Sequence, residues 1–175
     1  TWIAVPANAD WADVGCGTGA LCAAIVEHFD PASLTGVEPS AGFLNVARAT
    51  LPSRVALCSG NAAAISLAGA TVDVVVSGLV LNFIQDPGAA FKEMSRVAAG
   101  GAVFGAYVWD YAGKMEIIRH FWDAAVALDP GAGKLDEGLR FPICRPDGLA
   151  AQVSAAELQD VQVTAIDVPT PFASF

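Results

Sequence analysis

The chain has 175 residues, 54% of them hydrophobic, and a formal net charge of −9. No stretch approaches the roughly 18 consecutive apolar residues that a membrane-spanning helix needs, so we expect one soluble domain with no membrane partner. The 9 Lys and Arg residues are scattered, whereas nucleic-acid phosphates require clustered cations, so nucleic acid is not an expected partner. The 4 cysteines form neither a Cys-x-x-Cys pair nor a metal-ligand spacing, which indicates reduced thiols, a cytoplasmic location and no bound metal.

Short apolar segments alternate with amphipathic helical patterns up to residue 109. The helices are expected after residue 19, from a cap at Ser40, and from the Asp86-Pro87 pair to Gly100-Gly101. The alternation predicts an α/β fold with a doubly wound, mostly parallel sheet of order 3-2-1-4-5, in which the fourth strand lies in the interior. The segments expected to form these strands are residues 11–14, 34–37, 55–58, 72–77 and 102–109.

The second half of the chain has weaker patterns. Met115, Ile118 and Trp122 recur at helical spacing and predict a helix that runs to about residue 128. An irregular connection is expected over residues 129–147, where Gly and Pro recur. A further helix over 149–158 and a sixth strand over 161–168, beyond the fifth, complete the prediction.

A glycine-rich loop follows the first expected strand. The sequence Gly15-Cys16-Gly17-Thr18-Gly19-Ala20 fits the dinucleotide fingerprint G-x-G-x-x-(G/A). Glu38 stands at the end of the second expected strand, where a carboxylate can hold a ribose diol. On these two features alone, a nicotinamide or flavin site remains open.

Further segments distinguish the candidates. "ADVGCGTG" places Asp13 two positions before the first glycine and so reads D-x-G-x-G-x-G. "LTGVEPS", "SGNAAA", "VDVVVSGLVLNFIQDP" and "EMSRVAAGGAV" follow in order. With these motifs, residues 12–108 resemble the class I S-adenosylmethionine-dependent methyltransferases. The resemblance implies a Rossmann-like fold over the whole chain with residues 109–147 as a substrate-side lid, and a seventh strand for which the chain has no room after the sixth.

The resemblance also implies a cofactor site. The backbone of Gly15, Cys16, Gly17 and Gly19 would lie against the ribose and methionine parts of S-adenosylmethionine. Asp13 would face the methionine ammonium. S-adenosylmethionine carries a net positive charge and no phosphate, and a carboxylate at this loop favours such a cation and repels a pyrophosphate.

Other implied contacts lie at the ends of the second, third and fourth strands. Glu38, next to Pro39, would take both ribose hydroxyls. Asn61, where the family usually has aspartate, and Ala62 would lie beside the adenine. Ser77 would lie near the methionine end, and Asn82 near the reacting methyl group.

The implied reaction is an in-line transfer of methyl from sulfur, which leaves S-adenosylhomocysteine as product. It needs positioning and exclusion of water more than a catalytic side chain, so no catalytic residue is assigned. His28 is interpreted as structural, and His120 as a water-facing residue that is also a candidate base. The chain lacks the family's signatures for base methylation and for metal-dependent O-methylation, which leaves a small-molecule acceptor. An NAD-dependent oxidoreductase and a non-catalytic binding module remain as alternatives, and no pattern indicates the oligomeric state.

Overall fold

A computed structural model describes residues 4–171, which divide into two compact units between Val108 and Trp109. No helix among these residues is long and apolar enough to cross a membrane. The four cysteines are free thiols.

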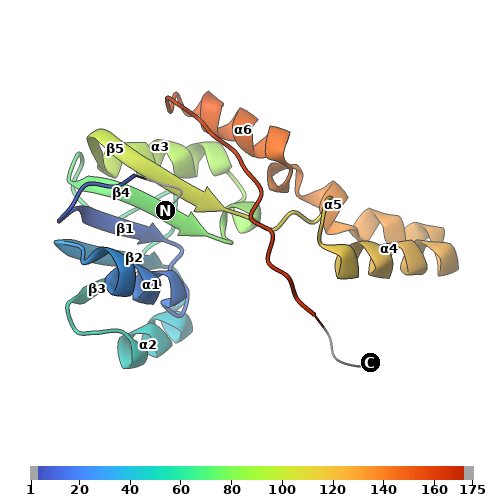
Figure 1. Ribbon diagram of the computed structural model, residues 1–175, viewed down its shortest axis with the longest axis horizontal. Helices are drawn as coiled ribbons and strands as arrows, with labels where there is room; N and C mark the ends of the chain where they lie inside the picture. Colours follow the sequence, from blue (N-terminus) through green and yellow to red (C-terminus); the bar gives the residue numbers. More distant parts are fainter. Residues whose placement is uncertain (1–3, 172–175) are drawn as a thin grey trace. The chain divides into compact units, whose positions relative to one another are not determined.

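The first unit is built on a five-stranded sheet in which every neighbouring pair is parallel (Figure 1). The order β3-β2-β1-β4-β5 confirms the expected topology, and β4 lies in the interior between β1 and β5. The order reverses between β1 and β4, which is the point where ligands bind in open α/β sheets. The strands are β1 (Asp10–Val14), β2 (Ser33–Glu38), β3 (Val55–Ser59), β4 (Val72–Gly78) and β5 (Ala98–Tyr107).

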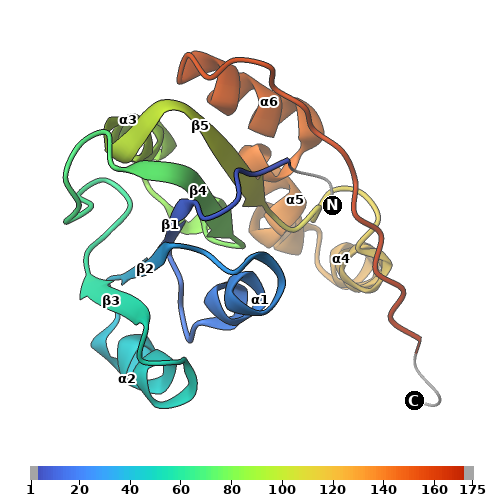
Figure 2. The same cartoon turned by 60° about the vertical axis from the view of Figure 1, so that its left-hand side comes forward.

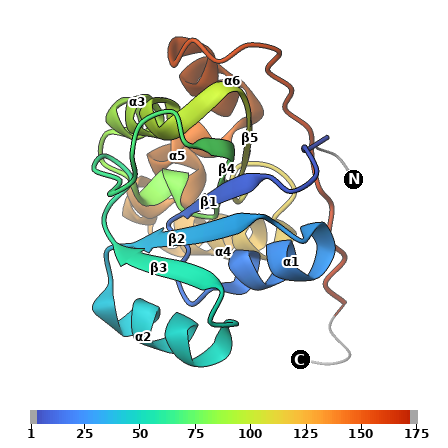
Figure 3. The same cartoon turned by 90° about the vertical axis from the view of Figure 1, so that its left-hand side faces the viewer.

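Three α-helices connect these strands, α1 (Ala20–Phe29), α2 (Ala41–Thr50) and α3 (Pro87–Val97). Helices α1 and α2 cover one face of the sheet and α3 the other (Figure 3), as right-handed crossovers in opposite directions require. The expected caps are confirmed. The Ser40 hydroxyl accepts a hydrogen bond from the Phe43 N–H at 3.3 Å, and the Asp86 carboxylate accepts one from the Ala89 N–H at 2.9 Å.

The Gly100-Gly101 pair does not end α3, and this prediction is wrong. The helix ends at Val97 and β5 begins at the next residue, so both glycines lie inside the strand. The pairing of β4 with β5 steps from Val72↔Ala98 to Val74↔Val103, and Gly101 has a φ of +83° within the irregular stretch. The glycines therefore allow an irregularity in β5, a use of glycine common in strands.

The core lies on both faces of β1 and β4. Val14, Val74 and Val75 are almost fully buried, as expected for central strands of a parallel sheet. Trp11 packs against Phe29 of α1 with ring centroids 5.1 Å apart.

The second unit is helical, with α4 (Glu116–Leu128), α5 (Glu137–Arg140) and α6 (Pro146–Ala155) (Figure 2). Helix α4 confirms the helix that was expected to run to about residue 128. The connection expected to be irregular instead contains the 3₁₀ turns Pro130–Leu135 and Pro142–Cys144 on either side of α5. The Arg119 guanidinium pairs with the Asp136 carboxylate there, and the Trp122 indole N–H donates to Glu137 at 2.6 Å. These non-local contacts order a segment whose composition favours turns.

The predicted sixth strand is wrong. Residues 161–168 form no strand, and Ile166 and Val168 are 68% and 72% exposed. A strand requires a partner for its backbone N–H and C=O groups, and an alternating apolar pattern cannot supply one. The helix expected at 149–158 begins earlier, at Pro146, because proline is suited to the first turn of a helix.

We expect the buried face of α2 to dominate its contribution to stability. Leu44 is 2% exposed, whereas Val46, two residues along the same helix, is 47% exposed. Leu44→Ala should lower the free energy of unfolding by about 2–5 kcal/mol, since it leaves a cavity in the core. Val46→Ala should change it by less than about 0.5 kcal/mol. Urea denaturation of the two variants tests this, and equal losses would contradict the observed packing of α2.

Candidate functional site

An open cavity of about 830 Å³ lies at the carboxyl edge of the first unit's sheet. Its lining comes from the ends of β1, β2, β4 and β5 and from the segments that follow β1, β2, β3 and β4. Its position at the reversal of strand order matches the general location of ligand sites in this architecture. The residues that line it are Asp13, Gly15–Thr18, Ala20, Leu21, Glu38, Pro39, Phe43, Gly60–Ala63, Gly78–Val80, Phe83–Asp86 and Tyr107.

Most of the residues predicted to bind the cofactor line this cavity, and Gly19, Ser77 and Asn82 do not. Gly19 caps α1 with a φ of +93°, and a Cβ there would lie 2.6 Å from Leu51. The Ser77 hydroxyl donates to the Val14 carbonyl at 2.9 Å and so ties β4 to β1. These two residues support the cavity wall. Asn82 is buried, and neither of its amide atoms has a hydrogen-bond partner within residues 4–171.

The glycine loop is held against the end of β2. The N–H groups of Gly15 and Cys16 both donate to the Val37 carbonyl, at 2.8 and 3.1 Å. Gly15 has a φ of +79°, and a Cβ there would lie 2.5 Å from a methyl of Val80. Gly17 has a φ of +55° and open space where a Cβ would stand. Gly15 is therefore required by packing, whereas Gly17 leaves the backbone open to a ligand.

Glu38 is 7% exposed and connects two backbone segments. One carboxylate oxygen accepts from the Gly17 N–H at 3.1 Å, and the other accepts from the Ser40 N–H at 2.9 Å. A carboxylate has about four acceptor positions, so each oxygen retains capacity for one more donor. Glu38 thus has a structural role beside the predicted one, and it can still accept two hydroxyl groups.

Asp13 is 1% exposed, at the end of β1. One of its oxygens accepts from the Cys22 thiol at 3.2 Å, and the other has no partner within the described part of the chain. Burial raises the pKa of the Asp13 carboxyl from 3.8 to about 6, against the lowering effect of the Cys22 hydrogen bond. A buried anion with an unsatisfied oxygen is costly, and a bound cation would offset that cost.

The cavity is acidic. Its lining includes three carboxylates, those of Asp13, Glu38 and Asp86, and no Lys, Arg or His of residues 4–171. Such a lining attracts a cationic ligand and repels a pyrophosphate. The residues present therefore fit S-adenosylmethionine, which is a net cation without phosphate, and fit a dinucleotide poorly. The described residues contain no group of three His, Cys, Asp or Glu side chains that could hold a metal ion, and independence from metal stays a prediction.

Sequence reasoning missed Tyr107, which ends β5 and lines the cavity. It pairs with Gly78, and a Cβ added to that glycine would lie 2.5 Å from the phenol oxygen. Burial and the charge of Asp13 raise the pKa of the Tyr107 phenol, which therefore stays protonated and can donate a hydrogen bond. The signal was its position near the end of the fifth expected strand, at the ligand-binding edge.

The fold is of the Rossmann-like class, and the acidic cavity at its ligand-binding edge is suited to a cation. A model of the methyltransferase domain family matches residues 12–105, more than half of the chain. The chain belongs to this methyltransferase family. Its expected Rossmann-like fold and the family's cofactor, S-adenosylmethionine, are thereby confirmed.

Among characterised proteins, the malonyl-[acyl-carrier protein] O-methyltransferase of Hahella chejuensis is 32% identical over 93 residues. The match covers 53% of this chain and 33% of that protein, so the chain spans only about a third of this relative's length. The structure of the YcgJ protein from Bacillus subtilis is similar with a TM-score of 0.64 and 20% identity, over 90% of this chain and 66% of that one. An S-adenosylmethionine-dependent methyltransferase from Mesorhizobium loti has a TM-score of 0.57 and 22% identity, over 63% and 52% of the two chains.

We expect the affinity for S-adenosylmethionine to fall as the pH is lowered through about 6, because Asp13 becomes protonated there. The stability of the ligand-free protein should depend on pH in the opposite direction. The pKa of Asp13 in the folded protein lies above the unperturbed value of 3.8. The free energy of unfolding of the ligand-free protein therefore falls as the pH rises from about 4 to about 6. Asp13→Asn should therefore raise the melting temperature of the ligand-free protein at pH 7.5 and weaken binding about tenfold. Calorimetric titration between pH 5 and 8 tests the affinity, and thermal denaturation without ligand tests the stability. A pH profile of affinity in Asp13→Asn that equals that of the wild-type protein would contradict this role.

Glu38→Ala should have two separate effects. Loss of the bonds to Gly17 and Ser40 should lower the melting temperature of the ligand-free protein. Loss of two charge-assisted bonds to the ribose should weaken binding of S-adenosylhomocysteine by about ten- to a thousand-fold. Thermal denaturation with and without this ligand separates the effects, with the exposed Glu27 changed to alanine as the control. Wild-type affinity in Glu38→Ala would exclude the proposed ribose contact.

Proposed function

We propose that this chain binds S-adenosylmethionine in the cavity at the carboxyl edge and transfers its methyl group to a small-molecule acceptor by in-line displacement. The observation that carries the proposal is the acidic lining, in which Asp13 retains one unpartnered buried oxygen. A ligand with a sulfonium and an ammonium group suits this lining. The pyrophosphate of a nicotinamide cofactor does not, which weighs against the oxidoreductase alternative.

In the proposed complex, each predicted contact residue has a distinct task. Asp13 would accept from the methionine ammonium, and the remaining acceptor positions of Glu38 would take the ribose hydroxyls. The open backbone at Gly17 would lie against the ribose and methionine parts. Asn61 and Ala62, which line the cavity after β3, would lie beside the adenine.

The sulfonium of the bound cofactor supplies an activated methyl group, so the protein has to hold the acceptor in line and exclude water. In the proposed complex the lining offers no free base, because the methionine ammonium and the ribose hydroxyls occupy the open acceptor positions of Asp13 and Glu38. Backbone N–H groups or a thiol donate to the carboxylates of Asp13, Glu38 and Asp86, and the Tyr107 phenol stays protonated. An acceptor that is already nucleophilic at neutral pH fits this environment best. We therefore propose a carboxylate as the acceptor group, with a methyl ester as product.

Charge sets the order in which the two ligands should bind. An anion is repelled by the empty acidic cavity, whereas the bound cofactor adds a positive sulfonium next to the acceptor's path. The acceptor should therefore bind after the cofactor. The Hahella relative is named for O-methylation of a malonyl group on an acyl-carrier protein. A carrier-linked carboxylate is accordingly the second candidate beside a free small molecule.

Transfer of radiolabelled methyl tests the proposal. The protein is incubated with labelled S-adenosylmethionine and with small carboxylates, phenols, amines or malonyl-acyl-carrier protein. We expect label only with carboxylate acceptors, in a form that mild base releases as methanol. His120→Ala should retain this activity, because His120 is exposed on α4 and a carboxylate needs no base.

Three results would contradict parts of the proposal. Binding of NADH without S-adenosylhomocysteine would favour the oxidoreductase. Binding of S-adenosylhomocysteine without turnover on any acceptor would favour a non-catalytic module. Base-stable label would exclude an ester product and leave the nature of the acceptor to be reassigned.

A further inference from the structure

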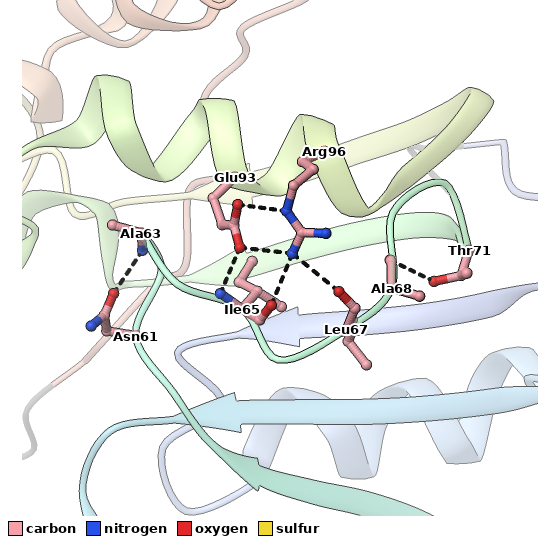
Figure 4. A network of polar contacts seen from close by, with 8 residues as sticks. All are labelled: Asn61, Ala63, Ile65, Leu67, Ala68, Thr71, Glu93 and Arg96. Carbon is pink, nitrogen blue, oxygen red and sulfur yellow. Dashed lines mark hydrogen bonds and ion pairs between the residues drawn. The ribbon is translucent and has the colours of Figure 1, made fainter.

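The loop between β3 and β4 carries the Asn61–Ala63 segment of the cavity wall. Its middle, at Ile65 and Leu67, is attached to α3 by two charged side chains, Glu93 and Arg96 (Figure 4). Neither of these side chains lines the cavity. They act on the loop through its backbone.

The contacts are specific and mutually dependent. The Ile65 N–H donates to the Glu93 carboxylate at 2.8 Å, and the Ile65 carbonyl accepts from the Arg96 guanidinium at 2.9 Å. The same guanidinium nitrogen donates to the Leu67 carbonyl at 3.1 Å and to Glu93 at 2.8 Å, while Arg96 Nε donates to Glu93 at 2.7 Å. Both backbone groups of Ile65 are thus satisfied by one ion pair on a neighbouring helix.

This ion pair differs from an ordinary surface pair on a helix. Exposed pairs three residues apart contribute little, because water solvates both charges. Here the Glu93 side chain is only 18% exposed, and the Arg96 hydrogens are directed to two carbonyls as well as to the carboxylate. The Glu93–Arg96 hydrogen bond holds the pKa of the Glu93 carboxyl down, at about 2, with the Ile65 N–H as the next contributor. The pair is therefore charged throughout the physiological pH range.

A short path leads from this clamp to the cavity wall. The Ile65 side chain is 4% exposed, and the preceding residues form a tight turn. Within the turn the Ala64 N–H donates to the Asn61 carbonyl at 3.0 Å, and the Ala63 N–H donates to the Asn61 side-chain oxygen at 2.9 Å. Movement of the Ile65 backbone would therefore move Asn61 with it.

The far end of the loop is held by the same helix. The Ala70 N–H donates to the Arg96 carbonyl at 3.0 Å, and the Thr71 N–H donates to the Val97 carbonyl at 2.9 Å. The far end of this stretch is held by the α3 backbone, whereas Ile65 and Leu67 are held by the Glu93 and Arg96 side chains. Substitution of Glu93 or Arg96 therefore removes the side-chain part of the attachment and leaves the backbone bonds in place.

We propose that Glu93 and Arg96 are positioning residues that set the adenine specificity of the cofactor site by fixing the loop that carries Asn61. The inference rests on the proposed function, which places the adenine beside Asn61 and Ala62. It assigns part of base recognition to an ion pair on the far side of the loop. A polar edge of a base is read only by groups held at the correct distance, so loosening the loop should weaken recognition of that edge first.

The test compares two ligands that differ only at the base, S-adenosylhomocysteine and S-inosylhomocysteine, in which an oxygen replaces the adenine amino group. Calorimetric affinities are measured for the wild-type protein, Arg96→Ala, Arg96→Lys and Glu93→Gln. Arg54→Ala is the matched control, because it removes an arginine and an ion pair, with Asp30, from the same unit without contact to the loop. Melting temperatures show that each variant is folded.

We expect the wild-type protein to prefer the adenosyl ligand by about tenfold or more, the value of one well-placed hydrogen bond. Arg96→Ala and Glu93→Gln should lose most of that preference, mainly through weaker binding of the adenosyl ligand. Arg96→Lys should not restore it, since an ammonium cannot bridge a carboxylate and two carbonyls as the planar guanidinium does. Arg54→Ala should retain the wild-type ratio.

Contrary outcomes are distinguishable. A wild-type protein that binds no S-adenosylhomocysteine would overturn the proposed function, and the inference with it. A wild-type preference that persists in Arg96→Ala would overturn the inference alone. Equal weakening of both ligands in the variants would show a general structural role and would also overturn it, as would a wild-type protein that does not distinguish the two bases.

Discussion

The Glu38 carboxylate is the interaction on which the rest of the cavity depends. It lies at the end of β2 and accepts from the N–H groups of Gly17 and Ser40, so one side chain joins the glycine loop to the start of α2. A buried carboxylate is tolerated because charge-assisted bonds satisfy both oxygens. The same arrangement orients its remaining acceptor positions toward the cavity that it lines. Structural support and the proposed ligand recognition are therefore combined in one group.

Asp13, in contrast to Glu38, destabilises the ligand-free fold and favours the binding of a cation. Its carboxyl is almost fully buried, has one unpartnered oxygen and carries a pKa raised to about 6 by burial. An isolated group of this kind destabilises the ligand-free fold, because the charged form is poorly solvated. It becomes favourable when a cation occupies the cavity. Together with the absence of Lys, Arg and His from the lining within residues 4–171, it gives the site a preference for positive ligands.

The walls of the cavity differ in how they are held. The loop after β1 is fixed by hydrogen bonds to the adjacent strand, at the Val37 carbonyl. The loop after β3 has no such neighbour at its centre and depends on Glu93 and Arg96 of α3. Side chains that never reach the ligand can in this way determine the geometry of the groups that do.

The sequence by itself determined the alternation of strands and helices, the caps at Ser40 and Asp86, and the glycine loop with Asp13 and Glu38. These features depend on the spacing of residues that are close together in the chain. Contacts between distant segments decided the rest. Tyr107 reaches the cavity only because β5 pairs with β4, and the pattern at 161–168 formed no strand because no partner supplied its hydrogen bonds. Gly100 and Gly101 lie inside β5 for the same reason: pairing with Val72 extended the strand through them. Such pairings join residues that are far apart in the chain, so local residue spacing does not predict them.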